Sequence, residues 1–366
     1  MLPHATVKAQ SKTIIVPDDY PTIQAAIDKA NAGDTVFVKN GTYNVTGGIN
    51  GININKPILL VGEDKKATVI EDEGSYYANS AIDITADNVT VSGFTIDGNG
   101  IPTGIHLQGN NCNISDNSIE SNGFVGIQTE NSENNVISTN NITNNGTYGI
   151  YLASSNSVIL GNIISTNNIG TGIIVDSCGN VTIKQNNISH NENGVIIRFY
   201  GPFYIYSNVI IDNSGFGLQF GENCSNSIVN DNKIALNQIG IDLMNFATTT
   251  DLDSTVRVDG YPLGTGNVVY KNIFDNQINA KVEHVFPDDI GYVSNGTDVV
   301  SWDKGLIGNY WSDYNNPFAY VIDANNVDHH PLPYLSTFAI AFIVIIVILA
   351  IVLTSLLLFR RDQKNR

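Results

Sequence analysis

A glycine followed by alternating apolar residues recurs through the middle of this chain at a nearly constant interval. Successive copies begin 22 or 23 residues apart. The glycines that open the motif are Gly104, Gly126, Gly149, Gly172, Gly194, Gly217 and Gly240. A fixed interval of this length is typical of a solenoid, in which each repeat forms one coil and packs against its neighbours.

The alternation within each repeat has the two-residue period of a β-strand. Leucine-rich repeats have a similar length, but their Leu-x-x-Leu-x-Leu frame is missing from this chain. Helical repeats need more than about 30 residues per unit and an apolar period near 3.6. We therefore predict an all-β chain that forms a right-handed parallel β-helix with coils of 22–24 residues.

Asparagine keeps the same interval as the glycines, and the chain contains 49 asparagines. One column that we expect to form a structural ladder comprises Asn117, Asn140, Asn162, Asn186, Asn208 and Asn232. Stacked coils lie about 4.8 Å apart, so amides at one corner can bond to the amides above and below. Most of the asparagine is therefore expected to be structural.

The two ends of such a stack need covering, because open sheet edges invite further pairing. Residues 18–30 predict a helix with proline near its first turn and an apolar face, followed by Gly33. We expect this helix to cap the first coil. The predicted order of segments is an N-terminal segment at 1–12, an N-terminal cap at 13–34, coils at 35–243, an insertion at 244–267, and last coils with a C-terminal cap at 268–333.

A run of 25 uncharged, largely apolar residues extends from Leu335 to Phe359. About 20 such residues span a bilayer, so we predict one transmembrane helix at 334–359. The basic tail 360–366 is then cytoplasmic and the β-helix is outside, which makes this a single-pass protein of the cell membrane. No signal peptide is visible, although residues 7–9 resemble the remnant of a cleavage site. A tail-anchored protein facing the cytosol is the competing topology.

The charge of the chain limits its partners. The net charge is −17, and without the tail after Phe359 the chain has 34 acidic and 14 basic side chains. Such a surface repels phosphate backbones, so a nucleic acid is excluded as a partner.

The opening and closing segments carry a family resemblance. Residues 15–27, with Gly33-Asp-Thr-Val and Gly41-Thr-Tyr, resemble the start of pectin-lyase-like β-helix proteins. The coils and the segment Gly308-Asn-Tyr-Trp-Ser-Asp-Tyr resemble the NosD-like "periplasmic copper-binding" family and related archaeal surface proteins. The resemblance covers about residues 13–333. It implies a scaffold that hosts lyases, hydrolases, epimerases and plain binding proteins.

The copper role that this resemblance implies has few ligands to support it. Copper favours Cys, Met and His at close quarters. Cys112, Cys178 and Cys224 fall on coils that are not adjacent, so we expect three separate thiols and no disulfide. His329 and His330 form a pair without a third ligand. We expect no cofactor.

Calcium is the other metal that the sequence leaves open. Asp251 and Asp253 in the insertion supply the oxygen ligands that Ca²⁺ prefers, but they lack the spacing of an EF-hand. A solvated acidic loop is the alternative.

Side chains two and four positions after each repeat glycine are expected to point outward. Catalysis of polysaccharide cleavage by a lyase needs a base and a cation, and in these columns Glu130, Asp176 and Arg198 could supply them. The alternative is a surface salt bridge between Asp176 and Arg198.

Binding without catalysis uses the same face. Aromatic, amide and charged side chains suit sugar rings, by stacking and hydrogen bonding. The candidate binding residues are His106, Gln128, Tyr151, Arg198, Tyr200, Gln219 and Asp242. We interpret the chain as a membrane-anchored, surface-exposed binding or structural module for a polysaccharide or another cell-envelope component. The alternatives are a polysaccharide lyase or hydrolase on the same scaffold and, third, a copper-delivery role.

Overall fold

The computed structural model describes part of the chain. The described residues are 11–45, 51–71, 78–167, 170–221, 224–250, 257–261, 266–285, 300–304, 307–314, 319–322 and 327–332. The segments predicted as a signal-peptide remnant, a transmembrane helix and a cytoplasmic tail lie outside these residues, as do Asp251 and Asp253. Within the described residues, no helix is long and apolar enough to cross a membrane.

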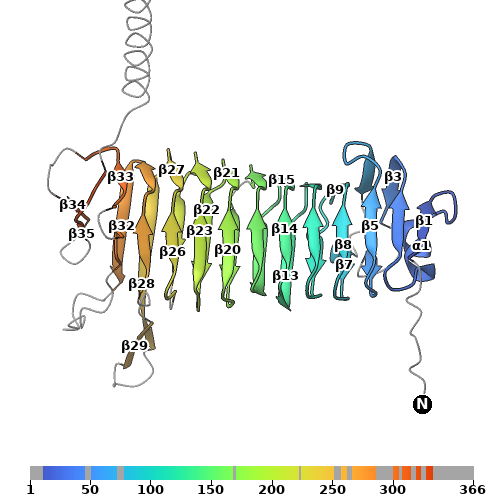
Figure 1. Cartoon of the computed structure of the whole chain (residues 1–366), viewed down its shortest axis with the longest axis horizontal. Helices are drawn as coiled ribbons and strands as arrows, with labels where there is room; N and C mark the ends of the chain where they lie inside the picture. Colours follow the sequence, from blue (N-terminus) through green and yellow to red (C-terminus); the bar gives the residue numbers. More distant parts are fainter. Residues whose placement is uncertain are drawn as a thin grey trace, which may run out of the picture.

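The chain folds as a right-handed parallel β-helix, which confirms the predicted class. Figure 1 shows the coils as a row of arrows that runs from the blue N-terminal end to the orange C-terminal end. Each regular coil contributes one strand to each of three sheets, which we call sheets A, B and C.

Sheet A has eleven strands. They are β1 (Thr13–Val16), β2 (Thr35–Val38), β5 (Leu59–Gly62), β8 (Thr90–Ser92), β11 (Asn113–Ser115), β14 (Val136–Ser138), β17 (Val158–Leu160), β20 (Val181–Lys184), β23 (Phe203–Tyr206), β26 (Ile228–Asn230) and β30 (Val268–Tyr270).

Sheet B also has eleven strands. They are β3 (Gly41–Asn44), β6 (Thr68–Glu71), β9 (Thr95–Asp97), β12 (Ser118–Glu120), β15 (Asn141–Thr143), β18 (Ile163–Ser165), β21 (Asn187–Ser189), β24 (Val209–Ile211), β27 (Lys233–Ala235), β31 (Ile273–Asp275) and β33 (Tyr310–Trp311).

Sheet C carries the longest strands and the outward columns of interest. Its members are β4 (Ile52–Ile54), β7 (Ser80–Ile84), β10 (Thr103–Leu107), β13 (Val125–Glu133), β16 (Tyr148–Ser155), β19 (Thr171–Asp176), β22 (Asn193–Arg198), β25 (Phe216–Phe220), β28 (Ile239–Thr250), β29 (Arg257–Tyr261) and β32 (Ile278–Val285). Strands β28 and β29 form an antiparallel hairpin at the predicted insertion. Two short strands, β34 (Tyr320–Val321) and β35 (Val327–Asp328), pair separately.

The repeat glycines allow the coils to stack closely. A Cβ atom on Gly149 would lie 2.6 Å from the carbonyl oxygen of Gly172 and 2.7 Å from a methyl carbon of Ile164. A Cβ on Gly172 would meet Gly194 in the same way, at 2.8 Å. Contacts this short are repulsive, so the glycine recurs because a side chain does not fit between successive coils.

The asparagine column forms a continuous hydrogen-bond ladder. From Phe94 onward, each backbone N–H at this corner donates to a side-chain oxygen one coil further on, at 2.8–3.1 Å. The acceptors are Asn117, Asn140, Asn162, Asn186, Asn208, Asn232, Asn272, Asn309 and finally Asp328. The ladder satisfies backbone donors where the chain bends between sheets A and B.

A short helix lies between β1 and β2. Helix α1 (Ile23–Lys29) begins after Thr22, whose hydroxyl accepts a hydrogen bond from the backbone of Ala25 at 3.2 Å. The helix is therefore shorter than the predicted 18–30 segment, because Thr22 supplies the N-cap. Its apolar face is buried with the solenoid core. The capping role of this helix stays a prediction.

Aromatic rings are concentrated near the C-terminal end of the stack. Trp302, Trp311 and Phe274 are each at most 1 % exposed. The ring of Trp311 stacks on Phe274 at 4.6 Å between centroids and on Tyr320 at 4.0 Å. These rings provide apolar contacts for the last coils.

Candidate functional site

A groove of about 390 Å³ lies on the outer face of sheet C, across β7, β10 and β13. We call it the sheet C groove. Its lining residues are Asn79, Ser80, Asp83, Thr85, Thr103, His106, Gln108, Gln128 and Glu130. The lining is polar and comes from three successive coils, so the parallel register itself brings these side chains together.

His106 lies at the centre of the groove between two carboxylates. Its Nδ1 is 2.8 Å from Oδ1 of Asp83, and its Nε2 is 3.5 Å from Oε2 of Glu130. The side chain of Asp83 is 7 % exposed, whereas that of Glu130 is 39 % exposed. Asp83 therefore orients the imidazole from inside, and Glu130 faces the solvent side of the groove.

The pKa of His106 is raised above its ordinary value. The main cause is the hydrogen bond to Asp83, which outweighs the opposing effect of burial, and the charges of Asp83 and Glu130 add to it. The imidazole thus holds its proton at a higher pH than a free histidine does. In this state both ring nitrogens are donors, one toward each carboxylate.

Gln128 places an amide beside this pair. Its Nε2 donates to Oε1 of Glu130 at 2.5 Å. The pairing of β13 with β16 shifts between Thr129 and Ser132, so the strand is irregular where Glu130 lies. The amide and carboxylate together offer a donor and acceptor array of the kind that sugar hydroxyls require.

Three aromatic rings lie beside the groove, one just before β13 and two on β16 of the next coil. We call Phe124, Tyr148 and Tyr151 the aromatic platform. The rings of Phe124 and Tyr148 are 5.7 Å apart edge to face, and those of Tyr148 and Tyr151 are 5.8 Å apart. Tyr151 is the register partner of Gln128, and Phe124 is 49 % exposed. A ring set with one exposed and two half-buried members beside a polar groove combines a stacking surface with hydrogen-bonding groups.

Asp176 lies on the far side of the platform. Its Oδ2 accepts a hydrogen bond from the hydroxyl of Tyr151 at 3.3 Å. The pKa of the Tyr151 hydroxyl is raised, first by burial and then by Asp176, with a smaller contribution from Glu130. Tyr151 therefore stays neutral and keeps its hydroxyl proton as a donor to Asp176.

The three predicted catalytic residues do not form one cluster. Glu130 contacts His106 and Gln128, while Asp176 contacts Tyr151 and Ser177. Arg198 is exposed and is the register partner of Asp176, but no ion pair joins these two described residues. The predicted surface salt bridge is therefore not formed either.

The remaining predicted binding residues lie away from the groove. Gln219 and Asp242 are 6 % and 0 % exposed, and the amide of Gln219 donates to Asp242 at 2.8 Å. Tyr200 is 64 % exposed at the corner after β22. Arg198 ends that strand. Only His106, Gln128 and Tyr151 of the predicted binding set belong to the groove and platform.

Sequence reasoning missed Asp83, Phe124 and Tyr148. Asp83 lies 23 residues before His106, but Ala81 stands where the later repeats have glycine. The interval alone could have found it. Phe124 and Tyr148 precede the repeat glycines of their coils by two residues and one residue, outside the columns that the alternation defines.

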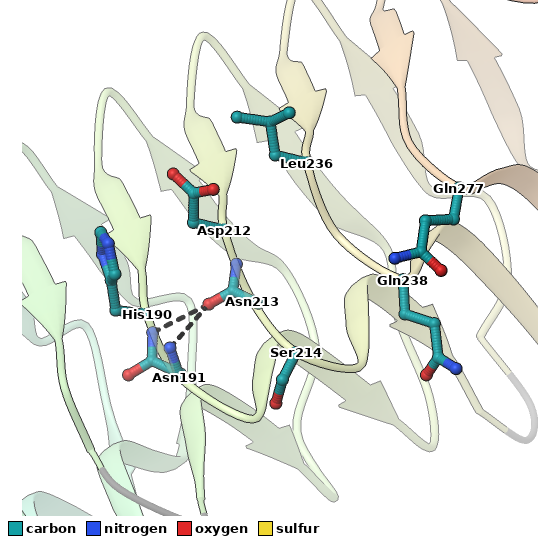
Figure 2. Close-up of a pocket in the computed structure, with 8 residues that line it drawn as sticks. All are labelled: His190, Asn191, Asp212, Asn213, Ser214, Leu236, Gln238 and Gln277. Carbon is teal, nitrogen blue, oxygen red and sulfur yellow. Dashed lines mark hydrogen bonds between the residues drawn. The ribbon is translucent and has the colours of Figure 1, made fainter.

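A second hollow, of about 430 Å³, lies at the corner between sheets B and C. Figure 2 shows its lining residues: His190, Asn191, Asp212, Asn213, Ser214, Leu236, Gln238 and Gln277. Asn191 and Asn213 bond to each other as rungs of a second asparagine ladder. No aromatic ring lines this hollow other than the imidazole of His190. The sheet C groove has the aromatic platform beside it and a histidine oriented by Asp83, so it is the better candidate site.

Comparison with known proteins identifies the family. The family model "Periplasmic copper-binding protein (NosD)" matches residues 27–173 and 147–316, which together are more than half of the chain. The chain belongs to the NosD family. A search of curated proteins finds no match to it.

Solved structures show the same fold at low sequence identity. The A-module of the Azotobacter vinelandii mannuronan C-5 epimerase AlgE4 is 16 % identical, with a TM-score of 0.58 over 79 % of this chain and 88 % of that one. Pectate lyase Pel9A is 16 % identical, with a TM-score of 0.54 over 79 % and 82 %.

A third neighbour is a tailspike protein of E. coli bacteriophage HK620, solved in complex with a pentasaccharide. It is 12 % identical, with a TM-score of 0.57 over 79 % of this chain. The NosD-family chain spans 57 % of that protein's length. At these identities the likeness shows the fold alone.

The name of the NosD family implies copper, but the described side chains do not fit that metal. No group of three or more metal-ligating side chains comes together in the described part of the chain. The three cysteines are buried thiols that form no disulfide, and burial raises the pKa of Cys178 to about 11 and that of Cys224 to about 12. Copper binds thiolates, and these groups are protonated thiols at neutral pH.

The two histidines of the predicted pair have different surroundings. Nδ1 of His330 lies 3.2 Å from Asp303, whereas His329 is exposed. We derive no chemistry through a metal from these residues.

Proposed function

We propose that this NosD-family protein binds glycans along the sheet C groove and the aromatic platform. The observation that carries the proposal is the position of one exposed and two half-buried rings beside a polar groove. Phe124 and Tyr151 offer apolar faces for sugar rings, and Gln128, Glu130 and His106 offer hydrogen bonds to hydroxyls. The groove volume falls within the range of small-ligand sites.

Two of the structural neighbours are compatible with this proposal. Pectate lyase and the pentasaccharide-bound tailspike are glycan-active proteins by name, and both share this fold. The fold does not determine the function, so the proposal depends on the side chains of the groove.

The test is glycan binding by the full-length chain and by two aromatic variants. Phe124→Ala is expected to weaken binding of any array hit by about two- to tenfold, since stacking on one ring contributes about 0.5–1.5 kcal/mol. Tyr204→Ala removes a comparable ring on sheet A and serves as the matched control. If both variants lost the same affinity for the glycan, or if neither lost any, the result would contradict a site on sheet C.

The same experiment separates binding from catalysis. Release of reducing or unsaturated ends during incubation would favour the enzyme alternative, with the oriented imidazole of His106 as its proton-transfer group. His106→Gln would then abolish turnover while Tyr204→Ala would not. Binding without release of ends supports a binding module.

Display on a membrane is also part of the proposal. Its support is the uncharged segment 335–359 followed by the basic residues Arg360 and Arg361. Extraction of the native protein into detergent, but not into carbonate buffer, is the expected result. Truncation before Tyr334 should release the chain into the soluble fraction, and a soluble full-length chain would contradict anchoring.

A further inference from the structure

We propose that the sheet C groove and aromatic platform select glycans that carry protonated amines, such as polymers of 2-amino sugars. This inference rests on the glycan-binding function proposed above and names its ligand class. It concerns charge, which the fold and the family do not determine.

The coils that form the site lack basic residues almost entirely. Between Lys66 and Lys184 the sequence contains eleven Asp and Glu and no Lys or Arg. These residues include every strand that contributes a side chain to the groove and to the platform. A uronate would therefore enter a field of like charge, whereas a protonated amine would be attracted.

Two carboxylates are placed on either side of the platform. Asp176 accepts the hydroxyl hydrogen of Tyr151. Glu130 lies two residues along β13 from Gln128, the register partner of Tyr151, and 39 % of its side chain is exposed. The partial exposure of Glu130 leaves one side of this carboxylate open to a ligand. An ammonium group that approaches Asp176 would meet Tyr151, whose hydroxyl bonds to that carboxylate.

The rings themselves favour a cation. The face of an aromatic ring carries partial negative charge and attracts an ammonium group placed over it. Phe124, Tyr148 and Tyr151 form a contiguous set with centroids 5.7 and 5.8 Å apart. Rings flanked by carboxylates recognise an amine better than they recognise a neutral hydroxyl.

The cations of the protein do not compensate this charge. His106 lies between Asp83 and Glu130, so its charge is offset by the buried carboxylate that orients it. Arg198 comes from the coil after Asp176 and makes no ion pair with it. The site therefore keeps a net negative charge with the imidazole protonated.

The experiment compares three hexasaccharides by calorimetry with the full-length chain. The probes are glucosamine hexasaccharide, its fully N-acetylated form and hexagalacturonate. The titrations are run at about pH 5.5. The glucosamine probe should bind about tenfold more tightly than the acetylated probe, and the uronate should bind least. Raising the salt to about 0.5 M should remove most of this preference.

Charge-neutral variants locate the preference. Glu130→Gln with Asp176→Asn should bring the two glucosamine-based probes to similar affinities, and Asp176→Asn alone should reduce their ratio. Glu120→Gln removes the same charge from sheet B and should leave the ratio unchanged. Thermal unfolding of each variant confirms that it is folded.

The outcomes separate the two proposals. If the acetylated or uronate probe binds as tightly as the amine probe, amine selection is wrong and glycan binding stands. If Phe124→Ala leaves glycan affinity unchanged, glycans bind outside the aromatic platform. Both the proposed site and the amine selection are then wrong. An amine preference that survives the double variant also overturns the inference.

Discussion

Oδ2 of Asp328 lies 2.8 Å from the backbone nitrogen of Asn309 and accepts its hydrogen. The same oxygen accepts the indole N–H of Trp311 at 2.9 Å, and the other carboxylate oxygen accepts the backbone N–H of His330 at 3.0 Å. A buried carboxylate thus ends a ladder that asparagine amides maintain from Asn117 onward. Among the described rungs of this ladder, the last one therefore carries a titratable group where the others carry neutral amides.

Acidification should stabilise the fold at this rung. Burial raises the pKa of Asp328, despite the hydrogen bonds that oppose the rise. A raised folded-state pKa gives a stabilising contribution that is full below the unfolded value of about 3.9 and is lost as the pH rises through the folded value. Between these values, the unfolding free energy of the natural chain should increase on acidification relative to Asp328→Asn. Urea unfolding followed by tryptophan fluorescence measures this free energy at each pH. If the natural chain and Asp328→Asn showed parallel pH profiles, the prediction would be wrong.

Removing one interior amide of the ladder should be costly. Asn162 accepts from the backbone and side chain of Asn140 and donates to Asn186 and Ile137. Asn162→Ala leaves several buried polar groups unsatisfied, for a loss of about 3 kcal/mol in unfolding free energy. Asn187→Ala, an exposed asparagine on the next coil, should cost under about 0.5 kcal/mol. Similar costs for the two variants in chemical denaturation would show that the ladder adds little.

A methyl group on a repeat glycine should also destabilise the stack. In Gly172→Ala the new carbon would lie 2.8 Å from both the Gly194 carbonyl oxygen and Ile188. The expected cost in unfolding free energy is about 1–3 kcal/mol, as for overpacking of a core. Thermal and chemical unfolding of the variant measure this loss.

A glycine of a different kind provides the control. Gly161 has φ +64°, and a Cβ atom placed on it would have only one neighbouring atom within 4 Å, at 3.8 Å. Asp116 and Asp231 occupy this corner in other coils with similar φ values. Gly161→Asp is therefore expected to change the melting temperature little, and a larger loss there than at Gly172 would contradict the steric explanation.

His106 should titrate above a free histidine, and Asp83 should be the reason. Its hydrogen bond to Asp83 is the main cause of the raised pKa, so Asp83→Asn should lower the pKa of His106. The histidine contributes stability that is full below about pH 6.5 and is lost as the pH rises through the raised folded value.

Proton NMR of the imidazole, assigned with His106→Gln, gives the pKa directly. The natural chain should also lose stability relative to His106→Gln as the pH rises through this range. A titration at or below the ordinary value would contradict the orienting role of Asp83.

The fold was predictable because its causes recur. The clash that selects Gly149 and the hydrogen bonds that select Asn162 act again on successive coils, so they leave a periodic trace in the sequence. The aromatic platform leaves no such trace. Phe124 and Tyr148 stand at different distances before their repeat glycines, and Asp328 follows Asn309 by 19 residues, outside the interval.

The burial of Gln219 and Asp242 was not predictable from alternation alone. The two-residue period tells which way a strand side chain points, but not what covers the outer face of the sheet. Ile174 and Ile196, in the same outward column, are likewise only 2 % and 7 % exposed. The exposed part of the column is therefore limited to the earlier coils.

The one-coil-at-a-time pairing has a mechanical consequence. Every sheet strand of the regular coils is held by the coil before it and the coil after it, and by no distant segment. A chain pulled from its ends would unwind from a terminus rather than rupture at once. Each coil of 22 or 23 residues would release about 70–80 Å of extended chain. Under load such a protein would therefore extend in steps of nearly equal length, one step for each coil that detaches.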